Sequence, residues 1–94
     1  MTDKVQRHME ICQEMNALYE RKNHDYGDSF HKSYQEYGLT MLLIRLEDKL
    51  NRLKTLSKKA SEVPEESIRD TLIDLANYPV MGIMELEELE NENH

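Results

Sequence analysis

The sequence predicts an all-α fold: an antiparallel helix bundle of two long helices, a short connecting helix and a C-terminal helix that a proline kinks or breaks. Apolar residues recur at spacings of three and four in three segments of the 94-residue chain, as in amphipathic helices. No segment alternates with the period of two that a half-buried strand requires, and no hairpin signal is present. The connecting segments are short, which favours antiparallel neighbours.

The composition predicts one small domain over residues 1–94. We expect it to lie in the cytoplasm, because the chain has neither a signal segment nor a membrane-spanning run, and Cys12 is its single cysteine. Only 38% of the residues are hydrophobic and 33% are charged, so the core of a monomer would be thin and self-association is expected. The net charge of −7 argues against direct binding to duplex nucleic acid. No membrane partner is expected.

The first helix is expected over residues 1–22, with Thr2 as its N-cap and Asp3 in its first turn. Residues 23–39 then form a loop with a short helix from Phe30 to Tyr37. Glycines punctuate this segment: Gly27 suits a turn with positive φ, and Gly38 ends the short helix. The apolar stripe of the first helix consists of Val5, Met9, Cys12, Met15 and Tyr19.

The second long helix is expected over residues 40–57, with Thr40 as its cap. Leucines repeat along it at spacings of three and four, a seam that packs on a partner helix. The leucines of this seam are Leu43, Leu46, Leu50 and Leu53.

The last helix is expected over residues 64–88, with Pro64 as its first residue and an acidic tail, residues 89–94, that frays. Pro79 lies inside the helical pattern and predicts a kink or break near Asn77–Tyr78. The expected apolar face consists of Ile68, Leu72, Leu75, Ile83 and Leu86.

Carboxylates line one side of this last helix. Glu66, Asp70 and Asp74 follow one another at a spacing of four, where like charges repel, and the chain contains no Lys or Arg after Arg69. If the second long helix and the last helix pair antiparallel, Asp48, assisted by Glu47, would meet Glu66 and Asp70. Such a set of oxygen ligands suits Mg²⁺, with Mn²⁺ as an alternative.

Ordinary salt bridges offer a second interpretation of the same acids. Arg45, Lys49 and Arg52 lie on the second long helix and would pair with Glu66, Asp70 and Asp74 across the helix interface. The spacing alone leaves both interpretations open.

Three blocks of the chain, "KNHDYGDSF", "YGLTMLLIRLEDKLNRL" and "ESIRDTLIDLANY", resemble the nucleotide modification associated domain family, found mainly in bacteriophages and bacteria. The resemblance runs from about Arg21 to Met84. The blocks are also similar to the MazG-like all-α nucleoside triphosphate pyrophosphohydrolases, which bind Mg²⁺ through EExxE on one helix and ExxD on the next, with an Asn two turns after the Asp. Asp70 and Asn77 match that last spacing, but Asn51 and Ser67 stand where the pattern has acids.

The resemblance implies a Mg²⁺-dependent (d)NTP pyrophosphohydrolase that releases a monophosphate and pyrophosphate, acts in phage nucleotide metabolism or DNA base modification, and assembles as a homodimer or tetramer. If a phage encodes the chain, its location is the host cytoplasm. The implied catalytic residues are Asp48, Glu66 and Asp70, which together with Glu47 hold the metal. The implied substrate-binding residues are Lys22, Asp25, Tyr26, Lys49, Arg52 and Asn77.

Two other functions remain open. The altered acid positions, Asn51 and Ser67, favour a module that binds a nucleotide or a partner enzyme without turnover. The chain would otherwise be a helix-bundle interaction protein whose acids are solvated or paired.

Overall fold

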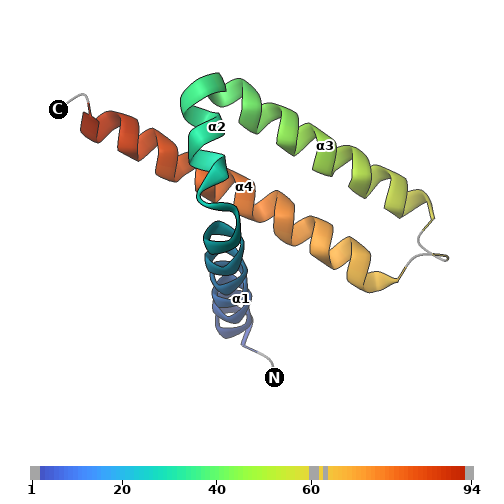
Figure 1. The fold of residues 1–94 in the computed structure, drawn as a ribbon. Coiled ribbons are helices and arrows are strands. Elements are labelled where there is room, and N and C mark those ends of the chain that lie inside the picture. Colours follow the sequence, from blue (N-terminus) through green and yellow to red (C-terminus); the bar gives the residue numbers. More distant parts are fainter. Residues whose placement is uncertain (1–2, 60–61, 63, 93–94) are drawn as a thin grey trace.

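The computed structural model describes residues 3–59, 62 and 64–92, and within them it confirms the all-α fold (Figure 1). No strand occurs among these residues, and none of their helices is long and apolar enough to cross a bilayer. The helices in chain order are α1 (Lys4–Tyr26), α2 (Ser29–Tyr37), α3 (Leu39–Lys58) and α4 (Glu65–Glu92).

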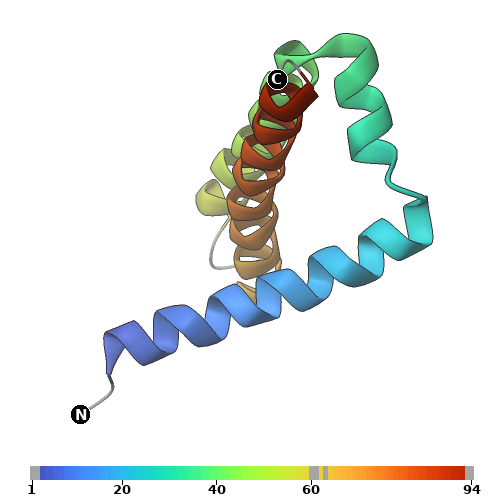
Figure 2. The same ribbon diagram turned by 90° about the vertical axis from the view of Figure 1, so that its left-hand side faces the viewer.

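The helices α3 and α4 form an antiparallel pair with the most extensive contact in the structure (Figure 1). The short helix α2 packs against both of them near the start of α3. Helix α1 crosses α4, and its N-terminal part extends away from the other helices (Figure 2). As a result, α1 contains no buried residue, and the core lies where α2, α3 and α4 meet.

The core is small and combines aromatic and aliphatic side chains. Phe30 and Tyr34 of α2 pack with Met41 and Leu42 of α3. Three half-buried residues pack against this group: Leu46 of α3, and Tyr78 and Met81 of α4. The two long helices approach closely at Gly82, where an added methyl carbon would lie 2.5 Å from Cδ2 of Leu42. A larger residue at position 82 would therefore require the side chain of Leu42 to shift.

Two glycine turns set the direction of α2. Gly27, at φ 59° and ψ 41°, ends α1 with its N–H on the carbonyl of Asn23, and Asp28 also takes positive φ. Gly38, at φ 66° and ψ −152°, occupies a region of backbone conformation that is essentially restricted to glycine. The predicted roles of Gly27 and Gly38 are confirmed, although α1 continues past Lys22 to Tyr26 before the turn.

The predicted N-caps are different in the structure. Thr2 lies outside the described residues, and Asp3 caps α1 by accepting a hydrogen bond from the N–H of Val5 at 3.0 Å. Thr40 was expected to cap the second long helix but lies within α3, which begins at Leu39. Gly38 is instead the N-cap residue of α3, without a side-chain cap hydrogen bond.

The predicted leucine seam of α3 is only partly correct. Leu46 and Leu53 are half-buried, but Leu43 and Leu50 remain 57% and 44% exposed, while Met41 and Leu42 are buried. The reason is that α2 covers the start of α3 from one side, and this shifts the buried face away from the regular seam.

The predicted apolar face of α4 is largely exposed. Leu72, Ile83 and Leu86 are 50%, 55% and 54% accessible, because α3 packs on a different side of the helix, where Thr71 and Gly82 are buried. The helix also runs through Pro79 to Glu92, so a break there is absent, and residues 89–92 of the tail expected to fray are helical, while 93–94 lie outside the described residues. Pro79 is exposed, and the packing of Tyr78 and Met81 on either side of it holds the helix together.

Candidate functional site

A cavity of about 330 Å³ lies between the second half of α1, the start of α2 and the middle of α4, with one wall residue from α3. This volume is at the lower end of the range for small-molecule sites. Its lining combines aromatic rings with charged and amide groups. The lining residues important here are Tyr19, Lys22, Tyr26, Phe30, Arg45, Asp74, Asn77 and Tyr78.

Aromatic rings form much of the cavity wall. The rings of Phe30 and Tyr78 lie 6.1 Å apart with an angle of 27° between their planes, so each fixes the other. Tyr26 lies on the wall and is 68% exposed. Burial raises the pKa of the Tyr19 phenol, and the charges of Asp28 and Glu85 raise it further, so its hydroxyl is neutral at physiological pH. Planar rings with a hydroxyl donor suit a heteroaromatic ligand.

A second cavity, of about 300 Å³, adjoins the first. It is lined by Arg45, Asp48, Lys49 and Arg52 of α3 and by Tyr78 of α4. Arg45 and Tyr78 line both cavities, so the aromatic cavity and the cationic cavity share part of their wall. Spacing on α3 produces the cationic end, because residues 45, 48, 49 and 52 fall on one face of a helix.

Asp74 ties the cationic residues to α4. Its Oδ2 lies 3.1 Å from Nζ of Lys49, and its Oδ1 lies 3.5 Å from Nζ of Lys22. One carboxylate therefore joins α1, α3 and α4 at the cavity. The salt-bridge interpretation of the acid stripe holds for this residue, and Asp74 is only 23% exposed in its side chain.

The local charge differs in sign from that of the whole chain. Four cations, Lys22, Arg45, Lys49 and Arg52, line the two cavities, against two carboxylates, Asp48 and Asp74. The local balance is therefore +2 in a chain whose net charge is −7. An acidic chain that concentrates its cations beside an aromatic cavity is suited to an anionic small molecule.

The structure does not bring the predicted metal-binding acids together within one chain. Lys49 lies level with Asp74 in the antiparallel pair, so Asp48 lies level with about Leu75. Glu66 is about nine residues nearer the start of α4, roughly 13.5 Å at 1.5 Å per residue, and Asp70 is about five residues nearer, roughly 7.5 Å. These distances along the axis are too long for three carboxylates to share one ion.

Among the described residues, the potential metal ligands that converge in a group of three are His31, Glu85 and Glu88, none of them predicted. Glu66 and Asp70 are exposed on α4, and no ion pair is recorded for either within the part of the chain that the structure describes. The predicted repulsion along the acid stripe is therefore relieved by solvent at these two positions.

The predicted substrate-binding residues fall into two groups. Asp25 lines neither cavity, and the same is true of Glu47, the assisting metal ligand. Asn77 lies in the aromatic cavity, and its Nδ2 donates a hydrogen bond to the carbonyl of Met15 at 3.4 Å. The predicted residues that line a cavity are Lys22, Tyr26, Lys49, Arg52 and Asn77, together with Asp48.

Sequence analysis missed several residues of the site. Tyr19 was assigned to an apolar stripe, Arg45 and Asp74 to salt bridges, and Phe30 to the start of a short helix. Tyr78 was considered only as a neighbour of Pro79. Two tyrosines could have indicated the site, because Tyr19 and Tyr78 are amphipathic residues on helix faces that also carry charged groups.

Helix α1, which forms one wall of the cavity, is held to α4 by polar contacts. Arg69 of α4 makes a bidentate ion pair with Glu14 of α1, in which Nη1 donates to Oε1 at 2.9 Å and Nη2 to Oε2. The hydrogen bond from Asn77 to Met15 follows about two turns further along α4. These contacts, together with the ion pair between Lys22 and Asp74, help to set the position of α1, which has no buried residue.

The ion pair between Glu14 and Arg69 predicts a pH dependence of stability. The hydrogen bond and charge of Arg69 hold the pKa of Glu14 below its ordinary value of 4.5. The pair therefore stabilises the fold fully above about pH 4.5, and its contribution is lost as the pH falls through the lower pKa of the folded protein. Urea unfolding should show less loss of stability on acidification in Glu14→Gln than in the unaltered protein. Equal losses in the two proteins would contradict this.

Residues 22–86 match the sequence family described as Nucleotide modification associated domain 1. The match covers more than half of the chain and all residues that line the two cavities except Leu18 and Tyr19 of α1. Searches of curated proteins and of solved structures find no match.

Proposed function

The chain belongs to the nucleotide modification associated domain 1 family, and from this premise we propose that it binds a nucleotide across its two adjoining cavities. The observation that supports the proposal most strongly is their junction. Arg45 and Tyr78 line both cavities, so the aromatic end and the cationic end are within reach of one ligand. A nucleotide has the same two parts, a planar base and a polyanion. The proposed setting is the metabolism or modification of nucleotides.

The base and sugar occupy the aromatic cavity in this proposal. Phe30 and Tyr78 offer ring surfaces held in place by their mutual contact, and Tyr26 offers an exposed ring that can close over a base. Asn77 carries both a donor and an acceptor, which suits the edge of a base or a sugar hydroxyl.

The phosphates lie towards the cationic cavity. Arg45 and Arg52 carry planar guanidinium groups that bind phosphate oxygens in pairs, and Lys49 adds a point charge. Asp74 holds Lys22 and Lys49 in place before a ligand arrives. Preorganised cations lose less conformational entropy on binding, which favours affinity.

A thermal-shift screen tests the proposal. The four deoxynucleoside triphosphates, their monophosphates and the nucleosides are added with and without Mg²⁺. A nucleotide present at 100 times its dissociation constant should add about 2.7 kcal/mol to the free energy of unfolding. Triphosphates should stabilise more than nucleosides, because only triphosphates reach the cationic cavity. Absence of any shift across the panel would contradict nucleotide binding.

Hydrolysis to a monophosphate and pyrophosphate is a second candidate function, and Asp48 is the observation that favours it. Asp48 lines the cationic cavity beside Lys49 and Arg52. Magnesium needs only one or two protein carboxylates when phosphates complete its coordination, and it would offset charge on the transferring phosphorus. Asp48, without Glu66 and Asp70 of the same chain, is the carboxylate that fits this role. Pyrophosphate released by the unaltered protein but not by Asp48→Asn would support hydrolysis.

We also propose that the chain forms a homodimer through the exposed apolar face of α4. Leu72, Ile83 and Leu86 lie on one side of this helix and are about half exposed, and Pro79 lies between them. The buried hydrophobic residues of a single chain are few, so a second copy would complete the core. Two copies of one helix face can pair about a two-fold axis, which makes a self-complementary interface.

Charge introduced into this face should dissociate the dimer. Ile83→Glu is expected to give monomers at concentrations where the unaltered protein is dimeric, because pairing would bury an unpaired carboxylate. Sedimentation equilibrium measures the mass directly. The matched control is Leu43→Glu, an equally exposed residue on α3. If the unaltered protein sediments as a monomer at every concentration, this interface is wrong.

A further inference from the structure

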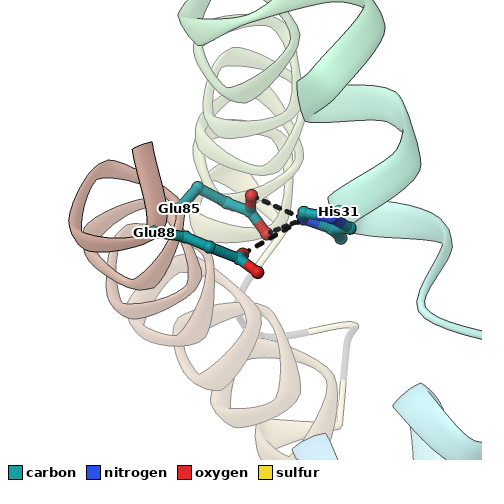
Figure 3. Close-up of side chains that lie close together, drawn as sticks. All are labelled: His31, Glu85 and Glu88. Atoms are coloured by element: carbon teal, nitrogen blue, oxygen red, sulfur yellow. Dashed lines mark hydrogen bonds and ion pairs between the residues drawn. The ribbon is translucent and has the colours of Figure 1, made fainter. Parts of the chain in front are cut away.

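Outside the two cavities, His31, Glu85 and Glu88 converge between α2 and α4 (Figure 3). Nδ1 of His31 lies 2.8 Å from Oε2 of Glu85 and 3.4 Å from Oε2 of Glu88. One potential ligand atom from each of the three residues lies within 4.8 Å of the other two. Two ligands bound at about 2.1 Å to one tetrahedral or octahedral ion lie roughly 3.0–3.4 Å apart, so the two distances from His31 are close to those of a coordination shell.

Rigid elements hold these three side chains. Glu85 and Glu88 are three positions apart on α4 and point to one side of the helix, and His31 approaches from α2 (Figure 3). Glu85 is a buried carboxylate with 8% of its surface exposed. A carboxylate is rarely buried unless a cation or a metal ion compensates its charge.

The charge around the cluster is negative. Two carboxylates face one imidazole, and Asp28, which precedes α2, adds a third negative charge nearby. A protonated imidazole supplies one positive charge to this group, whereas a divalent ion would supply two.

We propose that His31, Glu85 and Glu88 form a binding site for a divalent transition-metal ion that fastens α2 to α4. The mixed ligand set indicates the class of metal. Imidazole favours zinc, iron, nickel and copper over magnesium and calcium, and two carboxylates neutralise a doubly charged ion. Three protein ligands leave at least one position for water or another ligand.

The site has a structural consequence for the nucleotide cavity. Phe30 precedes His31, and Met81 lies one turn before Glu85, so the cluster adjoins the cavity wall made by these residues. The cationic residues of α3 lie towards the opposite end of the cavity, because Lys49 is level with Asp74. The ion therefore sets the distance between α2 and α4 and does not contact the phosphates.

Calorimetric titration of the metal-free protein, without a polyhistidine tag, tests the site with Zn²⁺, Mn²⁺ and Mg²⁺ as separate probes. We expect one Zn²⁺ per chain, weaker binding of Mn²⁺, and no binding of Mg²⁺ at the same concentrations. Sγ of Cys12 lies 3.7 Å from Nδ1 of His8 on α1, so these residues could form a competing pair of zinc ligands. The substitution Cys12→Ser is therefore present in every protein that is titrated.

Single substitutions then assign the ligands. Glu88→Gln keeps an exposed side chain of the same size and should weaken Zn²⁺ binding at least tenfold, while His31→Gln should abolish it. The matched controls are Glu87→Gln on α4 and His24→Gln at the end of α1, both exposed, and they should leave the affinity unchanged. If His31→Gln does not fold, as judged by circular dichroism, Glu88→Gln decides the question.

Two results would overturn the proposal. The first is the absence of saturable binding of Zn²⁺ and Mn²⁺. The second is an equal affinity in the Glu88→Gln and Glu87→Gln proteins, which would place any bound ion elsewhere. Nucleotide binding is measured in parallel, and because Glu88 lines neither cavity, failure of the metal site leaves the nucleotide proposal standing.

Discussion

Replacement of Arg45 by methionine is expected to weaken the binding of a nucleoside triphosphate by roughly ten- to a hundred-fold. Arg45 lines both cavities and lies where the sugar meets the phosphates in the proposed complex. A hydrogen bond between charged groups contributes about 1.5–3 kcal/mol, and each 1.4 kcal/mol changes a dissociation constant about tenfold. Methionine keeps the aliphatic part of the side chain, so the variant removes mainly the charge. Calorimetric titration measures the effect.

The control for this variant is Arg21→Met. Arg21 is exposed on α1 and lines neither cavity, so its loss removes the same charge from the chain without touching the site. The affinity of the corresponding nucleoside should change little in Arg45→Met, because a nucleoside has no phosphate. If Arg45→Met and Arg21→Met weaken triphosphate binding equally, the effect is one of net charge and the assigned site is wrong.

Replacement of Phe30 by alanine is expected to destabilise the fold by about 3–5 kcal/mol, the usual cost of removing a buried aromatic ring. The Phe30 ring is 92% buried, since 8% of its surface is exposed, and it contacts Tyr34 and Tyr78. Total stabilities of small domains are about 5–15 kcal/mol, so this loss is a large part of the whole. Urea unfolding followed by circular dichroism gives the change in the free energy of unfolding.

Tyr37→Ala serves as the matched control, because Tyr37 lies on the same helix and is 64% exposed. Its loss should cost less than about 1 kcal/mol. A similar cost for both substitutions would mean that α2 does not pack its aromatic face against α3 and α4. The arrangement of the cavity wall would then be incorrect as well, because Phe30 belongs to both.

The helices were predictable from sequence because their signals are local. Gly27 and Gly38 end helices where positive φ is needed, and the apolar periodicity defines each helix without knowledge of its partners. Helix faces were harder to predict. Leu72, Ile83 and Leu86 look like a buried face in sequence, yet they are exposed in a single chain, since burial depends on which helices pack on α4. Periodicity identifies an apolar side but not its partner.

The candidate site was predictable in part for a similar reason. Lys22, Lys49 and Asn77 were predicted to contact the ligand, and in the structure they line the cavities. The metal ligands were selected from a spacing within α4, but whether Asp48 reaches Glu66 depends on the register between two helices. No sequence signal fixes that register. In the structure Gly82 contributes to it, by allowing Leu42 to approach closely.

The central claim is that one nucleotide occupies both adjoining cavities. Two-dimensional ¹H–¹⁵N NMR spectra during titration with a deoxynucleoside triphosphate test it most directly, since each backbone amide reports on its own surroundings. The account predicts that the largest shifts occur at Arg45, Lys49, Asn77 and Tyr78. Absence of saturable shifts, or shifts confined to the α4 face around Ile83, would contradict it.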